Sequence, residues 1–350
     1  MTEQTSANAT NCAADGEIHE PHLGVFVLTE FVYCARAGLC AWETGHEEVD
    51  MPARSYFFFN PLYSLAEIEA ALQRTVTELT WFMAGAAFSA ALAAALAVLI
   101  NPTIGLVAAV GVIWFLGFAG LRGIRAAQLN HQRKQALAGK LREPDPNSPD
   151  VQPIHWWDFI RAGFVTQSVH DRLVDSERNF SGRPDRFLRR GNTIIPVWRM
   201  PHYAGRLFPQ NFIRMSAYCQ LVQQSLGAGV ECPYGITLFE HGWDGVAIPV
   251  TTQRKAELLE ALRAAREIIE KSRRRHGPQP PSPSVCAHCP YGKPRIHVVN
   301  ETEHVCDGKS LAVIPEVAAN GRCYHSLCGD RFRWLPPHED VAKKDLRSQV

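Results

Sequence analysis

Two short stretches of this 350-residue sequence carry residue types that do chemistry. Near the C-terminal end, "CAHCPYGKPR" contains Cys286 and Cys289 at the Cys-x-x-Cys spacing typical of metal ligands. Earlier, "SGRPDRFLRRGNTIIPVWRM" places Asp185 before two β-prone runs that are joined by a polar turn. A carboxylate supplies the hard oxygen ligands that Mg²⁺ demands. The sequence therefore offers one candidate site of thiols and one built around a carboxylate.

The context of the cysteines decides how they are interpreted. Met1 to His22 is polar and acidic, without the basic and apolar regions of a secretion signal. We therefore expect the ten cysteines to face a reducing cytoplasm, where clustered Cys binds metal more often than it forms disulfides.

Charge is balanced over the whole chain. The 36 basic and 35 acidic residues give a net charge of +1, which does not by itself select nucleic acid as a partner. Any such surface must be local. One candidate is the hairpin around Asp185, where the predicted nucleic-acid-binding residues are Arg183, Arg186, Arg189 and Arg190, with Arg199 nearby. The alternative is a solvated hairpin.

The segment from Leu79 to Leu121 contains no charged residue. Asn101, Pro102 and Thr103 divide it into Leu79 to Ile100 and Ile104 to Leu121. Each part is near the roughly 20 residues that a helix needs to cross a bilayer. The segment predicts a transmembrane hairpin, and its lack of ionisable residues favours an anchor over a transport role.

The charges that flank this hairpin predict its orientation. Basic residues follow the second span and the turn carries none, so both ends are expected in the cytoplasm of a bacterial cell, with the hairpin in the inner membrane. These residues are Arg122, Arg125, Arg133, Lys134 and Lys140. Gly85, Ser89, Ala93 and Ala97 recur every four residues, a ridge that lets two helices approach closely.

The remaining chain predicts a mixed α/β fold. "GVFVLTEFVYCARAGLCAWE" indicates a helix with Thr29 as its cap, and Ser64 is expected to cap a helix that leads into the membrane. Apolar residues between 212 and 222 have the period of a helix packed on a sheet. A later helix is expected to bury Leu258, Leu262, Ala265 and Ile269.

Five pieces of the sequence, in order, resemble the CRISPR-associated, RecB-like iron–sulphur exonuclease family of the PD-(D/E)xK superfamily. They are "LTEFVYCARAGLC", "LVDSERNFSGRPDRFLRRGNTIIPV", "IRMSAYCQLVQQSLGAGVECPYGITLFE", "RKAELLEALRAAREIIE" and "CAHCPYGKPR". The resemblance covers about half the chain and skips the membrane hairpin. It implies a restriction-endonuclease-like core with an inserted transmembrane hairpin and a Cys-rich metal-binding tail.

The resemblance also implies a degenerate active site. Asp185 matches the metal-binding Asp of the family, whereas Trp198 and Met200 stand at the positions of its Glu and Lys. Arg214 replaces a Gln, and Arg199 cannot substitute for the Lys because alternate residues of a strand point to opposite faces. Two-metal hydrolysis needs its carboxylates, so we expect no Mg²⁺ or Mn²⁺ at Asp185 and no phosphodiester hydrolysis.

The family's cluster ligands are matched in part. The resemblance assigns Cys34, Cys286 and Cys289 to a [4Fe–4S] cluster, and the last Cys of the family falls on Arg295. His297 is the candidate to replace it, with Cys306, Cys323 and Cys328 as alternatives. A zinc site formed by Cys286, Cys289, Cys323 and Cys328 is the rival interpretation.

These observations leave three functions open. The first is a membrane-tethered, catalytically degenerate nuclease-like platform for DNA or a protein partner. The others are an active nuclease with a rearranged metal site, and a structural metalloprotein of a membrane complex. The predicted segments are a disordered N-terminus (1–22), the N-terminal part of the nuclease-like domain (23–78), the hairpin (79–121), a basic segment and linker (122–153), the core (154–277) and a Pro-rich linker with a Cys/His tail (278–350).

Overall fold

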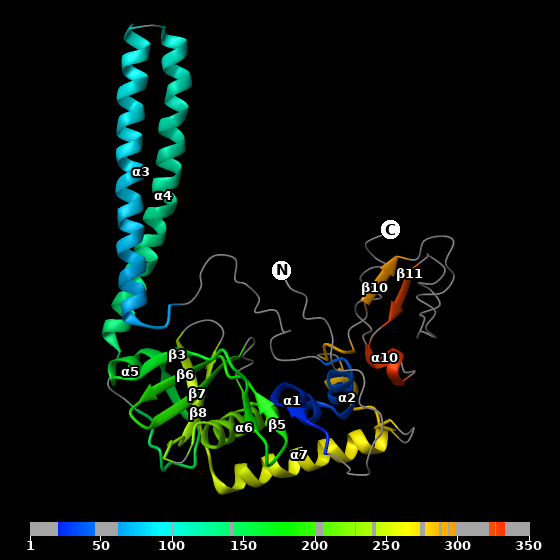
Figure 1. The fold of residues 1–350 in the computed structure, drawn as a ribbon. Coiled ribbons are helices and arrows are strands. Elements are labelled where there is room, and N and C mark those ends of the chain that lie inside the picture. Colours follow the sequence, from blue (N-terminus) through cyan, green and yellow to red (C-terminus); the bar gives the residue numbers. More distant parts are fainter. Residues whose placement is uncertain are drawn as a thin grey trace. The chain divides into compact units, whose positions relative to one another are not determined.

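The structure is a computed structural model of mixed α/β class (Figure 1). It describes residues 20–45, 62–99, 101–139, 143–200, 206–227, 229–239, 243–273, 277–286, 289–292, 295–298, 322–325 and 327–332. The chain forms two compact units. The smaller comprises Met1–Glu47, Val174–Ser181 and Leu259–Val350, and the larger comprises Glu48–Leu173 and Gly182–Leu258.

The larger unit is built on a six-stranded mixed sheet in the order β2-β9-β8-β7-β6-β3. Its central pair, β7 and β8, is parallel and is connected through helix α6, whereas all the other neighbours are antiparallel. The strands are β2 (Gln152–His155), β3 (Val165–Ser168), β6 (Arg186–Arg190), β7 (Thr193–Met200), β8 (Tyr234–Phe239) and β9 (Asp244–Pro249). Gly191, with φ 59°, starts the predicted turn between β6 and β7. A left-handed conformation of this kind suits glycine.

Two helices from different parts of the chain pack on this sheet. Helix α6 (Pro209–Ser225) lies so close to β8 that a Cβ added to Gly235 would come within 3.0 Å of the Met215 sulfur. A separate buried cluster joins strand residues such as Ile195 and Val197 to the aromatic side chains of α5 (Trp156–Arg161). Helix α6 confirms the helix that the sequence predicts between residues 212 and 222.

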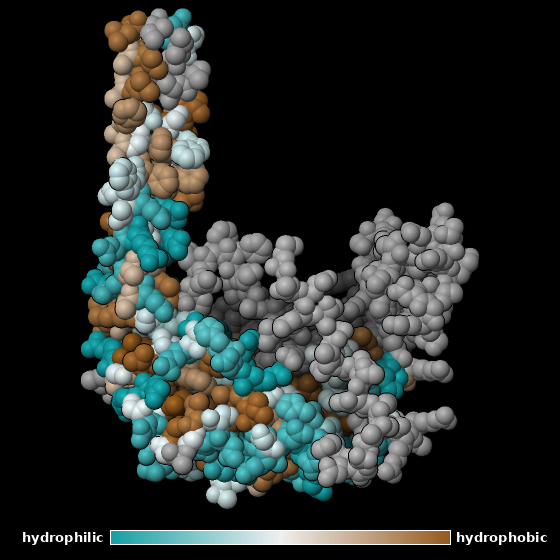
Figure 2. All heavy atoms as spheres, in the orientation of Figure 1, coloured by the Kyte–Doolittle hydropathy of each residue, from teal (hydrophilic) through white to brown (hydrophobic). Residues whose placement is uncertain are grey.

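The predicted membrane hairpin is present as two helices, α3 (Leu65–Leu99) and α4 (Pro102–Ala138). Both are long and apolar enough to cross a membrane. Hydrophobic residues gather on the part of the hairpin far from the sheet, and hydrophilic residues gather near its base (Figure 2). The aromatic ring of Phe115 packs against Gly85, since a Cβ at this glycine would meet it at 2.8 Å. The small residue thus permits the close approach that the ridge predicts.

Both helices extend beyond the apolar segment. The sequence predicts a basic segment and linker after residue 121, but α4 remains helical to Ala138. Ion pairs join the two helices there, at 2.9 Å between Glu78 and Arg122 and at 3.2 Å between Glu69 and Arg133. Charges that are satisfied between neighbouring helices allow both helices to continue beyond the apolar region.

The base of the hairpin belongs to the core of the larger unit. Ser64 caps the start of α3, as the sequence predicts, and Glu67 completes a reciprocal cap by accepting the backbone N–H of Ser64. Tyr63, Ile68 and Ala136 are buried in the same cluster as Trp156, whose indole N–H donates to the carbonyl of Tyr63 at 2.9 Å. The two ends of the hairpin therefore meet in one hydrophobic core.

The smaller unit combines a short sheet with several helices. One sheet has the strand order β1-β5-β4 and a second pairs β10 with β11, and among the described residues Cys40, Cys286 and Cys328 lie on helices of this unit. The elements are β1 (Leu23–Gly24), α1 (Val25–Tyr33), α2 (Ala35–Glu43), β4 (Leu173–Asp175), β5 (Phe180–Gly182), most of α7 (Thr252–Arg273), α8 (Pro283–Cys286), β10 (Arg295–Val298), β11 (Arg322–His325) and α10 (Leu327–Phe332). The predicted apolar face of α7 is confirmed, because Leu258, Leu262, Ala265 and Ile269 are buried.

One predicted cap is wrong. Thr29 lies inside α1 rather than at its start, and its hydroxyl donates to the Phe26 carbonyl at 2.8 Å. The apolar residues before it extend the helix to Val25. The helical segment then breaks at Cys34, whose extended backbone separates α1 from α2.

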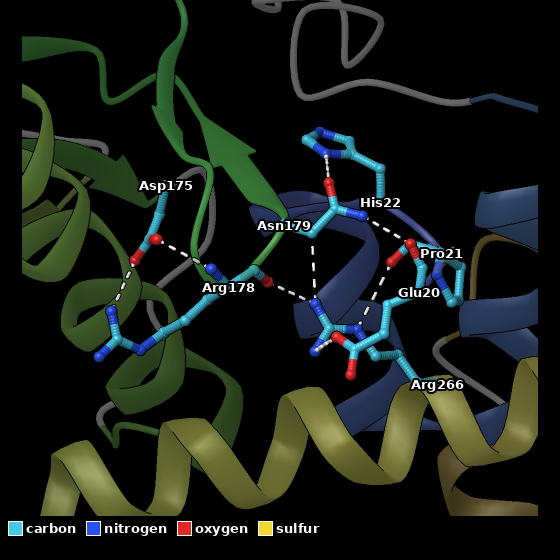
Figure 3. Close-up of polar contacts among 7 residues, drawn as sticks. All are labelled: Glu20, Pro21, His22, Asp175, Arg178, Asn179 and Arg266. Atoms are coloured by element: carbon cyan, nitrogen blue, oxygen red, sulfur yellow. Dashed lines mark hydrogen bonds and ion pairs between the residues drawn. The ribbon is translucent and has the colours of Figure 1, made fainter. Parts of the chain in front are cut away.

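Polar contacts hold the strand that leads into α1 (Figure 3). Arg266 of α7 forms an ion pair with Glu20 at 2.7 Å and donates to the Arg178 carbonyl. Asn179, at a φ of 44°, bonds the Glu20 carbonyl at 2.5 Å and a ring nitrogen of His22 at 2.9 Å. These contacts fix β1 beside β5 and, because α1 follows directly, they help to position Cys34.

Candidate metal centres

Asp185 lies at the end of the sheet, immediately before β6. Its backbone N–H donates to the Val197 carbonyl at 3.0 Å. Its carboxylate accepts the backbone N–H of Arg199 at 2.6 Å. The side chain therefore continues the hydrogen-bond pattern between β6 and β7, so one of its oxygens has a structural partner.

The neighbouring positions on β7 are apolar and buried. Trp198 and Met200 are 9% and 5% exposed. The guanidinium of Arg214, from α6, lies 4.1 Å from the centre of the Trp198 ring. Instead of a second carboxylate and a Lys, the structure has an indole stacked under a cation, an arrangement that is itself stabilising.

Arg199 lies on the other face of β7, as the sequence predicts. Its guanidinium lies 5.5 Å from the Tyr63 ring and 5.6 Å from the Trp243 ring, and it donates to the Phe239 carbonyl at 3.3 Å. The alternation of a strand separates it from Trp198. It cannot take the place of a Lys beside Trp198.

The electrostatic surroundings of Asp185 do not resemble those of a metal-binding carboxylate. Asp185 reaches solvent, yet the protein packed around it removes part of its hydration and raises the pKa of its carboxyl. The hydrogen bond from Arg199 and the charges of Arg214, Arg199 and Arg186 act in the opposite direction. Trp198, Met200 and the guanidinium of Arg214 supply no oxygen ligand to a cation at Asp185, so these residues do not fit Mg²⁺ or Mn²⁺.

The four predicted phosphate-binding arginines do not share one environment. Arg190 binds both carboxylate oxygens of Glu143, at 2.6 and 2.8 Å. The guanidinium of Arg186 stacks 3.6 Å from the centre of the Tyr63 ring. Arg189 is exposed and its Nε contacts the Gly191 carbonyl at 3.4 Å, and Arg183 is half-buried. The residue most accessible to a phosphate in this group is Arg189.

The three thiols predicted as ligands all belong to the smaller unit. Cys34 stands at the break between α1 and α2, Cys286 ends α8, and Cys289 follows in a turn. The hydroxyl of Tyr33 donates to the Val285 carbonyl at 2.5 Å, and the N–H of Cys289 donates to the Cys286 carbonyl at 3.0 Å. The residue before Cys34 is thereby bonded to the residue before Cys286.

Cys328 belongs to the same group. Its N–H donates to the carbonyl of Tyr291 at 3.0 Å, two residues beyond Cys289. The side chains of Cys34, Cys286, Cys289 and Cys328 are all buried, with at most 9% exposure. Cys40, on α2, is buried as well at 3%.

Burial is the main cause of the raised pKa of these thiols, and backbone hydrogen bonds to Cys289 and the charge of Arg36 near Cys328 act against it. Burial raises the pKa of Cys289 to about 11 and of Cys328 to about 12, and a charge on Cys34 acts in the same direction on both. Burial and then Cys34 also raise the pKa of Cys286. For Cys40, burial and then Cys328 raise the pKa to about 12. A negative charge on one of these thiols would therefore raise the pKa of others in the group.

His297, the predicted replacement ligand, lies on β10 opposite Cys323 of β11. Cys306, another candidate, is outside the described residues. Within the described part of the chain, no three His, Cys, Asp or Glu side chains are gathered as a single metal ion would require.

Two features escaped the sequence-based prediction. The stacking of Arg214 on Trp198 leaves no sequence signal, because it depends on how α6 crosses β7. Cys40 lies near Cys289 and Cys328, and its only signal is its place in the same Cys-bearing segment as Cys34.

The sequence matches no protein-family model and no curated protein.

Proposed function

We propose that this chain is a membrane-anchored, nuclease-like protein that serves as a platform for DNA or a protein partner and does not hydrolyse phosphodiester bonds. The order of elements supports the resemblance to the PD-(D/E)xK superfamily. An antiparallel pair, β6 and β7, carries Asp185 and is followed by α6 and by β8, which runs parallel to β7. This is the helix and strand that the resemblance places after the active site.

The observation that carries the loss of hydrolysis is the environment of Asp185. Its carboxylate bonds the backbone of Arg199, the guanidinium of Arg214 stacks on Trp198, and buried Trp198 and Met200 occupy the space where ligands would stand. Hydrolysis of this class needs carboxylates that hold metal ions and generate a hydroxide. A buried indole and a thioether supply neither function.

The hairpin supports the membrane anchor. The start of α3 and the end of α4 are buried in one core, so both chain segments that flank the hairpin lie on the same side of the membrane. Basic residues after the second span favour the cytoplasmic side of a bacterial inner membrane.

A local basic surface supports nucleic acid as the partner. Arg189 is exposed on β6, and Arg183 precedes the same strand. Phosphate contacts of this kind position nucleic acid without reading its sequence. The net charge of +1 makes any attraction local rather than global.

The smaller unit is proposed to carry an iron–sulphur cluster with Cys34, Cys286 and Cys289 among its ligands. Buried thiols from separate segments supply the soft donors that such clusters use. A bound cluster would supply iron–thiolate bonds that cross-link the segments. The residues themselves position those thiols through the Tyr33–Val285 and Cys289–Cys286 hydrogen bonds.

Two assays on the full-length, detergent-solubilised protein test the proposal. We expect no cleavage of single- or double-stranded DNA in Mg²⁺ or Mn²⁺, and filter binding of DNA that weakens as salt is added. Cleavage that disappears in Asp185→Ala would instead establish an active nuclease with a rearranged site. Absence of DNA binding at low salt would leave a protein partner as the ligand of the platform.

A further inference from the structure

We propose that Arg74 of α3 and Arg125 of α4 bind the phosphate groups of anionic phospholipids at the base of the membrane hairpin. The inference rests on the membrane anchor proposed above and adds to it a class of lipid that the hairpin recognises. Both arginines belong to the larger unit and lie outside the charge-free part of the two helices.

The two helices of the hairpin lie in one antiparallel register. The Phe82 ring of α3 stacks on the Phe118 ring of α4 with centroids 5.5 Å apart, and Glu78 pairs with Arg122 at 2.9 Å. A step of four residues along α3 is therefore matched by a step of four along α4. In this register the two ends of the charge-free segment 79–121 are level with each other, so one membrane boundary crosses both helices there.

Arg74 and Arg125 lie at the depth of the lipid headgroups. Arg74 is five residues and Arg125 is four residues outside the charge-free segment. At about 1.5 Å per helical residue, these separations are about 6 to 8 Å from the hydrocarbon boundary. The headgroup layer on each side of a bilayer is about 5 to 8 Å thick. Both guanidinium groups therefore reach the layer that contains the phosphates.

The same two arginines keep a charge that a lipid can neutralise. Both are exposed, and among the residues that the structure describes neither forms an ion pair. By contrast, Arg122 and Arg133 are paired with glutamates of α3. A guanidinium binds phosphate through two parallel hydrogen bonds, and the negative surface potential of an anionic leaflet adds to the attraction. The base of the hairpin therefore fits a leaflet that is rich in anionic lipid.

An exposed tryptophan lies at the same end of the hairpin. Trp81 is 74% exposed and lies two residues inside the charge-free segment, a depth at which indoles are enriched in membrane proteins. No aromatic or charged residue stands between Phe88 and Trp114, the part of the sequence that contains the turn. Hydrophilic residues likewise gather near the base (Figure 2). The residues suited to contact headgroups are therefore concentrated in one leaflet.

The test measures lipid preference by fluorescence quenching in full-length protein reconstituted into bilayers. Phosphatidylglycerol or phosphatidylcholine carries bromine on its acyl chains, and bromine quenches the tryptophans of the spans, Trp81 and Trp114. Mixtures of one brominated lipid with the other, unbrominated lipid give the ratio of the two binding constants. We expect the wild type to prefer phosphatidylglycerol several-fold at low salt, and the Arg74→Gln/Arg125→Gln double variant to bind both lipids equally. A preference that survives in the double variant, or equal binding by the wild type, would overturn the proposal.

Lys134→Gln is the matched control. Lys134 is an exposed cation of α4 that lies thirteen residues outside the charge-free segment, at about 20 Å from the boundary. That distance exceeds the Debye length of about 8 Å at physiological ionic strength, so the lipid preference should be unchanged. An equal loss of preference in Lys134→Gln and in the double variant would show that total charge sets the preference, and would overturn the site.

A salt series on the wild type covers the case in which the double variant does not insert into bilayers. Added salt screens the attraction between exposed guanidinium groups and anionic headgroups, so the preference should fall as salt is raised. A preference that does not change with salt would contradict binding through these arginines.

The outcomes also separate this inference from the proposed function. Quenching by neither brominated lipid would place the hairpin outside the bilayer, and would refute the anchor together with the lipid site. Strong quenching by both lipids with equal binding constants would refute only the lipid site. Neither result bears on DNA binding or on hydrolysis, which depend on the sheet.

Discussion

The two candidate metal centres differ in how their ligands are built into the fold. At Asp185 the expected ligands lie on two adjacent strands, so replacing one of them by Trp198 both removes a donor and fills the space. The thiols come from α1–α2, α8, a turn and α10. Under the proposed function, the loss of the site at Asp185 and the retention of the thiol site follow from where the donor residues lie in the fold.

The largest expected effect would come from removing a thiol ligand. Cys34→Ser should abolish iron binding and destabilise the smaller unit by several kcal/mol, because binding free energy at a site absent from the unfolded chain is folding free energy. Iron content and thermal unfolding measure this. Cys40→Ser is the matched control, since Cys40 is equally buried on α2 but is not assigned as a ligand.

The same iron content and the same thermal stability in Cys34→Ser and Cys40→Ser would contradict the proposed difference between the two centres. Equal iron content in both variants would mean that the thiols are grouped only by packing. A zinc-loaded protein with unchanged stability in both variants would lead to the same conclusion.

An intermediate effect is expected at the carboxylate centre. Asp185→Ala should cost about 1 kcal/mol of stability, because it removes the acceptor of the Arg199 N–H. Asp185→Asn keeps an acceptor of similar shape and is the control. Denaturant unfolding measures both, and neither change should alter metal content. Loss of bound Mg²⁺ or Mn²⁺ in Asp185→Ala would show that this centre is not dismantled.

The pH dependence has a definite sign. Because desolvation raises the pKa of Asp185 in the folded state, its contribution is most stabilising at low pH and is lost as pH rises through that raised value. The stability of the wild type relative to Asp185→Asn should therefore fall as pH increases. A difference that grows with pH would mean that the arginines outweigh the lost hydration.

The smallest expected effect is on DNA binding by the arginines of β6. Arg189→Gln should weaken DNA binding about two- to threefold and reduce the salt dependence by about one phosphate contact. Arg190→Gln is the matched control, and a smaller change is expected because Arg190 already binds Glu143. Filter binding over a salt series measures both. Equal effects of the two changes would show that the pair with Glu143 opens for DNA.

Local patterns in the sequence were sufficient for several elements. The apolar segment after Leu79 predicts two helices, and the structure has them. The period of apolar residues identifies the buried face of α7 and the helix α6. These predictions succeed because periodicity and the absence of charge are properties of the chain itself. The cap at Thr29 fails because the apolar residues before it extend the helix.

The sequence by itself determined which donors exist: thiols, one carboxylate, and Trp198 and Met200 where a metal site would need other residues. Only the tertiary structure decided which of them meet. Nothing in the spacing distinguishes Cys328 from Cys306 or Cys323, but a hydrogen bond to Tyr291 and the pair between Arg331 and Glu43 place Cys328 next to the turn that follows Cys289 and next to α2. The physical reason is that a ligand set is defined by distance in space. Contacts between segments far apart in sequence set that distance, and periodicity does not report them.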